Sequence, residues 1–221
     1  MSIIENLFNI FAPHECLICK SEGDLLCSEC VGGLRKAPER CYKCSRPSDQ
    51  FRICQDCCIQ SPLFAVWAAV PYEAAARDLL HELKFARAKA AADTAASVLA
   101  ATCYPLKDVL VAHVPTVPGR IRERGYDQAA LIAKGLAARL KVPYLPLLAR
   151  TGEQRQLGQG REVRKQQMAG AFRSTNTAVV QNKHILVVDD VLTTGSTCEV
   201  AARALLDAGA ARVSAAVFAV A

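Results

Sequence analysis

The feature that most constrains the fold is a cysteine-rich segment near the start of the chain. Nine of the 11 cysteines lie between Cys16 and Cys58, a segment too short to bury a core of its own. Cysteines two residues apart can direct two thiolates at one tetrahedral Zn²⁺. The segment therefore predicts a zinc-ribbon module, whose eight candidate ligands form four CxxC pairs: Cys16/Cys19, Cys27/Cys30, Cys41/Cys44 and Cys54/Cys57.

The spacing leaves the grouping of these pairs open. Successive pairs can share an ion, which gives two sites in chain order. A cross-braced arrangement would instead join the first pair to the third, and a single filled site is a third possibility. Cys58 is expected to be a bystander, and His14 to face solvent rather than replace a ligand. We expect a cytoplasmic protein, and a reducing compartment does not sustain a disulfide framework of this kind.

After Pro62 the cysteines give way to apolar segments that alternate with alanine-rich ones. This alternation predicts an α/β domain with a mainly parallel sheet covered by helices on both faces. In the first helical segment Leu79, Leu80, Leu83 and Val98 are core candidates. The expected strands are 64–72, 108–115, 142–148, 184–190 and 212–220, and the expected helices are 73–101, 126–140 and 197–209.

We expect three parts along the chain. Residues 1–13 predict a short amphipathic helix, 14–61 the zinc-ribbon module and 62–221 the α/β domain. The first residues lack the basic region and cleavage site of a signal peptide. The apolar runs fall short of the roughly 20 residues that a membrane-spanning helix needs.

The expected strand at 184–190 ends unusually, in Asp189 and Asp190. Carboxylates at that position can accept hydrogen bonds from sugar hydroxyls, and Mg²⁺ can help to offset their repulsion. The hydroxyl-rich turn that follows, 193–197, leads into a helix with the capping-box spacing of Ser196 and Glu199, and Gly209 ends that helix. Backbone N–H groups at such a helix start favour phosphate. The segment predicts a site for a sugar 5-phosphate.

Positive charge is concentrated in one part of the chain. Residues 120–165 contain 11 lysines and arginines against 4 aspartates and glutamates, whereas the whole chain carries +6. This segment predicts an anionic ligand, either a phosphate ester or nucleic acid.

Two sets of residues resemble a known family. The segment ILVVDDVLTTGST, 185–197, resembles the phosphoribosyl-pyrophosphate (PRPP) motif of type I phosphoribosyltransferases. Three features precede this motif: the CxxC pairs, VPTVPGRIRERGYDQ at 114–128 and GAF at 170–172. Their order resembles that of the ComF family of competence-associated (ComFC- and GntX-like) proteins. The chain is therefore similar, over nearly its whole length, to a zinc-ribbon protein with a phosphoribosyltransferase domain.

The resemblance implies roles for individual residues. Asp189 and Asp190 would hold the ribose hydroxyls of PRPP, bound with Mg²⁺, while Arg120 and Arg124 would clamp the pyrophosphate, with Arg122 as a further candidate. The residues that would hold the 5-phosphate are Thr193, Thr194, Gly195, Ser196 and Thr197.

The resemblance also implies that the basic stretch 150–165 forms a hood over the site. Asp127 and Gln167 depart from the family pattern, in which an asparagine is expected at each position. A base-recognition role for these two positions is therefore in doubt. His113, His184, Cys103 and Cys198 are expected to be structural.

Two functions fit this reading. The first is a phosphoribosyltransferase whose acceptor no motif identifies. The second is a non-catalytic protein that binds PRPP or a nucleotide and single-stranded DNA. The resemblance implies that such a protein serves DNA uptake in natural transformation, with the import machinery at the inner membrane face.

Overall fold

A computed structural model describes residues 14–84, 88–103, 106, 108–151 and 170–221. The helix expected at 1–13, most of the expected hood and Gln167 lie outside the described residues. In chain order the elements are β1 (His14–Glu15), β2 (Glu22–Gly23), α2 (Ser28–Gly32), η1 (Asp49–Phe51), α3 (Gln55–Cys58), β3 (Val66–Pro71), α4 (Ala74–Glu82), α5 (Ala88–Cys103), β4 (Val109–His113), α6 (Pro118–Arg124), α7 (Gln128–Leu140), β5 (Leu148–Arg150), β6 (Phe172–Ser174), α9 (Thr177–Val180), β7 (His184–Leu192), α10 (Ser196–Asp207) and β8 (Arg212–Val220).

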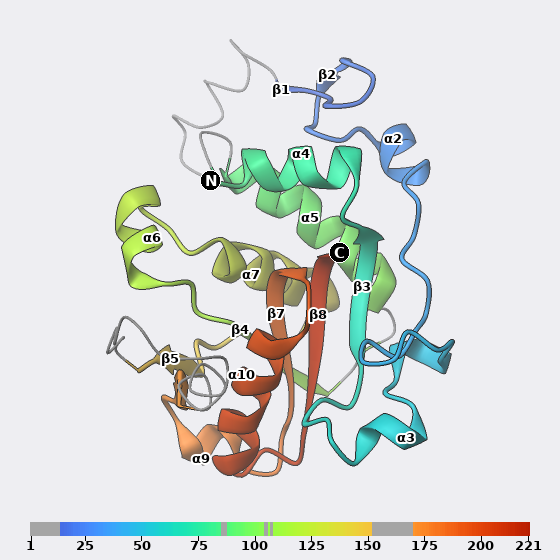
Figure 1. The fold of residues 1–221 in the computed structure, drawn as a ribbon. Helices are drawn as coiled ribbons and strands as arrows, with labels where there is room; N and C mark the ends of the chain where they lie inside the picture. Colours follow the sequence, from blue (N-terminus) through green and yellow to red (C-terminus); the bar gives the residue numbers. More distant parts are fainter. Residues whose placement is uncertain (1–13, 85–87, 104–105, 107, 152–169) are drawn as a thin grey trace, which may run out of the picture.

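The centre of the described structure is a parallel sheet with the strand order β3-β8-β7-β4 (Figure 1). On β7, Val187 lies opposite Ala112 of β4 on one side and Ala215 of β8 on the other. All three strand pairs are parallel, and β3, β4 and β8 are almost entirely buried, whereas β7 is buried in its first half, from Ile185 to Val188. The predicted α/β class is therefore confirmed, and near-continuous apolar strands are what a sheet covered on both faces requires.

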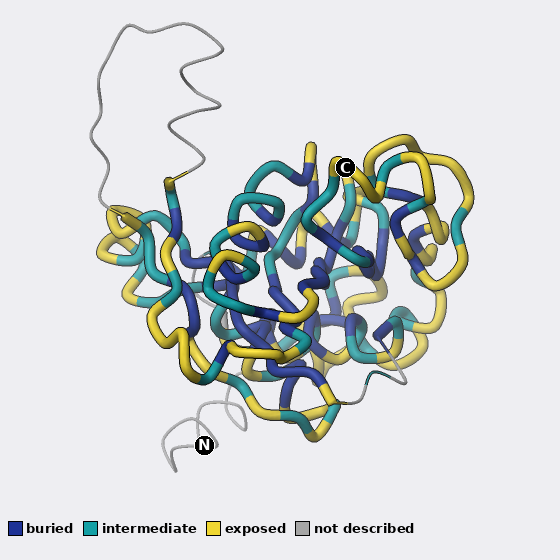
Figure 2. Tube along the Cα trace, turned by 90° about the horizontal axis from the view of Figure 1, so that it is seen from below, coloured by how far each residue is buried: buried dark blue, intermediate teal, exposed yellow. Residues whose placement is uncertain are grey.

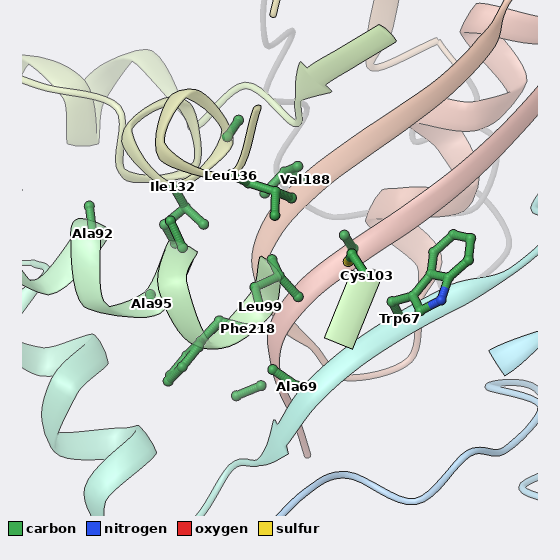
Figure 3. Packing of buried hydrophobic residues seen from close by; sticks show 14 of the residues in the cluster. Trp67, Ala69, Ala92, Ala95, Leu99, Cys103, Ile132, Leu136, Val188 and Phe218 are labelled. Atoms are coloured by element: carbon green, nitrogen blue, oxygen red, sulfur yellow. The ribbon is translucent and has the colours of Figure 1, made fainter. Parts of the chain in front are cut away.

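Helices α4, α5 and α7 lie on one side of the sheet, and α9 and α10 lie on the other (Figure 1). The α5/α7 side packs Leu99 and Ile132 against Val188 and Phe218 of the sheet (Figure 3). The buried residues gather in the middle of the molecule and the exposed residues on its outside (Figure 2). Leu79, Leu80 and Leu83 are fully buried, as predicted, whereas Val98 is partly buried and packs at the edge of this core.

Two predicted elements differ from the structure. The helix expected at 73–101 is two helices, because α4 ends at Glu82 and α5 begins at Ala88. The strand expected at 142–148 is wrong for most of its length, where Tyr144 makes an isolated bridge to β4. Pro143 and Pro146 have no N–H to donate to a ladder, so regular pairing begins only at Leu148, in β5.

The cysteine-rich segment lies along the outer edge of β3 (Figure 1). The Ala37 N–H donates to the Ala69 carbonyl at 3.0 Å, and the Ile53 N–H donates to the Phe64 carbonyl at 3.1 Å. These bonds cover a strand edge that would otherwise be open to pairing with another chain. The division between 14–61 and 62–221 stays a prediction. Every helix within the described residues is too short or too polar to cross a membrane.

Candidate functional site

The eight paired cysteines form two compact groups. The first cysteine cluster is Cys16, Cys19, Cys27 and Cys30, and the second cysteine cluster is Cys41, Cys44, Cys54 and Cys57. Within each cluster the sulfur atoms lie within 4.8 Å of one another. The pairs are therefore grouped in chain order, and the cross-braced alternative is excluded.

The geometry of both clusters fits a tetrahedral zinc ion. The sulfur atoms of Cys19 and Cys27 are 3.7 Å apart, and those of Cys44 and Cys54 are 3.6 Å apart. Four sulfurs at the usual Zn–S distance of about 2.3 Å would be about 3.8 Å from one another. The donor set of four thiols is that of a structural zinc site, in which the ion supplies folding energy.

The acidities of the thiols point to the same conclusion. Burial opposes ionisation of Cys16, but backbone N–H groups, that of Cys27 foremost, lower its pKa to about 6. The Arg46 N–H is the main cause that lowers the pKa of Cys44 to about 6. Next to such thiolates, the pKa values of Cys30 and Cys57 are raised to about 12, chiefly by Cys27 and Cys54 respectively. Four thiolates this close together need a cation to stabilise them.

The remaining thiols lie outside both clusters. Cys58 is exposed and its Sγ donates to the Gln55 carbonyl at 3.0 Å. Cys103 and Cys198 are buried, and burial raises both pKa values. His14 belongs to neither cluster. These positions agree with the structural roles expected from the sequence.

A cleft of about 420 Å³ lies beyond the carboxyl ends of β4 and β7. In open parallel sheets this edge is the usual position of a ligand site. Of the predicted ligand-binding residues, the cleft brings together Arg120, Asp189, Asp190, Thr193 and Thr197. Its other lining residues are Tyr72, Lys84, Val114, Pro115, Thr116, Val117, Gln128, Arg150, Val191 and Ala221.

The two aspartates are adjacent in β7 and therefore point to opposite faces of the sheet. Asp190 faces α7, where its Oδ2 accepts a hydrogen bond from Gln128 Nε2 at 3.0 Å. Asp189 faces α10, and its Oδ1 accepts from the Asp190 N–H at 2.9 Å. Burial, and then the negative charge of Asp190, hold the pKa of Asp189 well above its usual value. Within the part of the chain that the structure describes, no ion pair joins either carboxylate to a cation, so the pair would gain from a ligand that supplies hydroxyl donors or a cation.

The predicted arginines all lie on α6 but differ in their position relative to the cleft. Arg120 lines the cleft, while Arg122 is exposed outside the lining. Arg124 reaches the cleft indirectly, because its guanidinium donates to Gln128 Oε1. Gln128 therefore links Arg124 to Asp190, and it is nearly fully buried. Gln128 was not among the site residues predicted from the sequence, although it follows directly after Asp127 in the arginine-rich segment.

The 193–197 turn has the features of an anion site, with one correction. Gly195 is the N-cap of α10 and has a φ of 80°, which a side chain would disfavour. The predicted capping box is wrong, because no side chain caps α10 and Glu199 instead accepts a hydrogen bond from Tyr42 Oη. Among the described residues, no hydrogen bond engages the N–H groups of Thr193, Thr194 and Gly195. The backbone of this turn thus offers free donors.

Asp127 is a structural residue in this fold. It caps α7 by accepting from the Ala130 N–H, and it also accepts from the N–H and hydroxyl of Thr116 at 2.8 and 3.0 Å. These bonds tie the cleft wall at Thr116 to α7. His113 bonds to Tyr144 and His184 to Ser214, and burial lowers the pKa of both imidazoles.

Two further basic residues line the cleft, Lys84 and Arg150. Arg150 Nε donates to the Pro115 carbonyl at 2.8 Å and belonged to the predicted hood. Lys84 follows the end of α4, and it belongs to no sequence motif that could have identified it as a cleft residue. Only the fold brings it to the same edge as Asp190.

Comparisons with known proteins agree with this arrangement. The phosphoribosyl transferase domain model matches residues 127–220. DNA utilization protein YhgH of Salmonella typhi is 30% identical over 91% of this chain and 94% of its own length. Competence protein ComFC of Bacillus subtilis strain 168 is 26% identical over 89% of this chain and 90% of its own length. The structure of adenine phosphoribosyltransferase from Thermoanaerobacter pseudethanolicus is 23% identical over 57% of this chain and 65% of its own, with a TM-score of 0.38.

The match to the Salmonella protein covers 91% of this chain, and the domain model covers the segment that carries Asp189, Asp190 and the 193–197 turn. The chain therefore belongs to the ComFC-like family, in which a cysteine-rich module precedes a phosphoribosyltransferase-fold domain.

Proposed function

We propose that the cleft binds PRPP together with Mg²⁺ and that the protein is a phosphoribosyltransferase that acts in DNA utilisation. The observation that carries this proposal is the cleft itself, which joins Arg120, the aspartate pair and the two ends of the 193–197 turn, Thr193 and Thr197. A phosphorylated pentose with a diphosphate needs hydroxyl acceptors, amide donors and positive charge, and the cleft supplies all three. The names of the relatives, DNA utilization protein and competence protein, support the biological role.

Each part of PRPP has a matching part of the cleft. The carboxylates of Asp189 and Asp190 accept from the ribose hydroxyls, and the free N–H groups of the 193–197 turn receive the 5-phosphate. Arg120 and Lys84 face the pyrophosphate end. When bound, Mg²⁺ neutralises charge on the pyrophosphate, and the oxygens of the aspartate pair are the hard donors that this ion prefers.

The reaction would need no nucleophile from the protein. The bond from the ribose C1 to the pyrophosphate oxygen breaks, its electron pair leaves with pyrophosphate, and a lone pair of the acceptor forms the new bond to C1. Arg120 stabilises the leaving charge, and the aspartates offset the positive charge that develops on the ring. Loss of one such preorganised charged group costs about 2.7–4 kcal/mol, or about 10²–10³ in rate.

The test incubates zinc-loaded protein with labelled PRPP, Mg²⁺ and a panel of nucleobases and measures pyrophosphate release. Release that depends on one base would support the proposal and name the acceptor. Calorimetry of PRPP binding supplies the second measurement, in which Asp189→Asn combined with Asp190→Asn abolishes binding. Asp78→Asn, on the exposed side of α4, is the matched control and leaves binding unchanged. Equal PRPP affinity of the double variant and the wild type would contradict the proposal.

A second candidate function is non-catalytic binding of PRPP and single-stranded DNA by an import factor at the inner membrane face. The observation that favours it is a basic aromatic surface at the far end of β8. There the guanidinium carbons of Arg52 and Arg212 lie 5.5 and 4.1 Å from the centroid of the Phe64 ring. Nine residues of strand separate this surface from the cleft, about 26 Å. Guanidinium groups can contact both bases and phosphates of a single strand.

This candidate predicts that an oligothymidylate binds with an affinity that falls steeply as salt rises. Fluorescence anisotropy over a salt series measures it, and Arg52→Ala with Arg212→Ala weakens binding. Salt-independent affinity, or PRPP turnover with no DNA binding, counts against the second candidate.

A further inference from the structure

The second cysteine cluster contacts the turn that would hold the phosphate. Its first CxxC pair encloses Tyr42 and Lys43, and both side chains reach Glu199 in the first turns of α10. Tyr42 Oη donates to Glu199 Oε1 at 2.5 Å, and Lys43 Nζ lies 3.0 Å from the same oxygen. The side chains of Lys43 and Glu199 are only 26% and 27% exposed, so solvent screens this ion pair less than a surface pair.

The Tyr42 ring also packs on the turn itself. A Cβ atom at Gly195 would lie 2.6 Å from Tyr42 Cε2, a distance at which one of the two must move. Gly195 is the left-handed N-cap at the centre of the 193–197 turn. The loop between two expected zinc ligands, Cys41 and Cys44, therefore forms the outer wall of the turn.

These contacts hold the Glu199 carboxylate at Tyr42 and Lys43 and away from the start of α10. The N-cap of α10 is Gly195, and Glu199 lies four residues later, one helical turn away on the same side of the helix. The N–H groups of Thr194 and Gly195 are free of other bonds among the described residues. A released Glu199 carboxylate would be drawn to these N–H groups and to the positive end of α10. It would then compete with a phosphate for the same donors.

We propose that Tyr42 and Lys43 are positioning residues that hold Glu199 off the 193–197 turn, so that zinc in the second cysteine cluster keeps the turn open for a phosphate ester. This inference rests on the proposed function, because the ligand of the turn is the 5-phosphate of the bound sugar. It makes the cysteine-rich segment part of the ligand site and assigns its metal a role beyond folding.

The test measures binding of ribose 5-phosphate to the zinc-loaded full chain by calorimetry. Tyr42→Phe combined with Lys43→Met frees Glu199 while keeping the aromatic ring against Gly195. We expect this double variant to bind on the order of tenfold more weakly, because hydrogen bonds to a charged group are lost. Adding Glu199→Gln should restore the affinity, since the competing carboxylate is then absent. A role in packing alone would not show this rescue.

Matched variants test the link to the metal. Cys44→Ser, in the second cluster, should weaken binding as the double variant does, whereas Cys19→Ser, in the first cluster, should not. Lys36→Met is the control for loss of a positive charge in the same segment, and it should bind like the wild type. Zinc content and circular dichroism establish that each variant is folded. If the double variant does not fold, Lys43→Met alone tests the same expected decrease in affinity for ribose 5-phosphate.

Two results would overturn the inference while leaving the proposed function intact. One is wild-type affinity in the folded double variant, and the other is weakened binding that Glu199→Gln does not restore. Failure of the wild type to bind either ribose 5-phosphate or PRPP would overturn the proposed function and this inference with it.

Discussion

Replacing Asp189 by asparagine should stabilise the fold while removing ligand binding. Asp189 is held with a raised pKa by burial and by the charge of Asp190, so its ionised form is unfavourable in the free protein. Asparagine has the same shape and keeps an Oδ1 that can accept from the Asp190 N–H. The change therefore removes a charge without opening a cavity.

The expected size follows from two opposing effects. Removal of a buried charge that lies beside the like charge of Asp190 contributes about 1–3 kcal/mol. Weakening of the backbone hydrogen bond, which loses its charged acceptor, costs on the order of 1 kcal/mol. The net gain is at most about 2 kcal/mol, which raises the melting temperature of a chain this long by up to roughly 8 °C. Asp78→Asn, at an exposed site, should stay within about 0.5 kcal/mol of the wild type.

The effect should depend on pH in a defined direction. The folded-state pKa of Asp189 lies well above its usual value, so the folded protein binds this proton more tightly than the unfolded chain does. The free-energy penalty of keeping Asp189 ionised in the folded wild type is fully present above the folded-state pKa. It is lost as the pH falls through that pKa. Thermal unfolding of the variant and the wild type from pH 8 to pH 5 measures this, and the difference in melting temperature should shrink as the pH falls. A less stable variant, or a difference that grows at low pH, would refute the reasoning.

Three further changes test the surrounding structure. A Cβ at Gly135 would lie 2.8 Å from a methyl group of α5. Gly135→Ala should therefore lower the free energy of unfolding, measured in urea, by about 1–3 kcal/mol, and unchanged stability would contradict this packing. Asp127→Ala removes the hydrogen bonds to Thr116 and the cap of α7, so it should lower the free energy of unfolding by about 1–2 kcal/mol. Asp127→Asn should lower it less, and equal losses in the two variants would argue against the cap. Cys44→Ser should remove one of two zinc ions in a metal assay, whereas Cys58→Ser should remove none.

Much of the fold could be predicted because its signals are local. The runs around Val111, Val187 and Val217 are apolar and the segments between them are helical, which is enough to specify a parallel sheet. The same reasoning places Asp189 and Asp190 at the carboxyl edge, where sheets of this class bind ligands. The CxxC spacing predicts zinc ligands because only short-range geometry is involved.

Other features required the three-dimensional structure. The grouping of the cysteine pairs depends on how the chain turns between them, which the spacing does not state. Glu199 was assigned to a capping box by local spacing, yet Tyr42, 157 residues away in the sequence, takes its carboxylate. Lys84 reaches the cleft only because α4 ends beside it. Contacts between distant segments override local preferences in each of these cases.

The central claim is that the aspartate pair and the 193–197 turn bind one sugar phosphate. A crystal structure of the zinc-loaded protein with PRPP and Mg²⁺ tests this claim most directly. We predict ribose density beside Asp189 and Asp190, with the 5-phosphate on the N–H groups of the turn. Density for PRPP elsewhere on the protein, or a cleft filled only by water at saturating ligand, would contradict the claim.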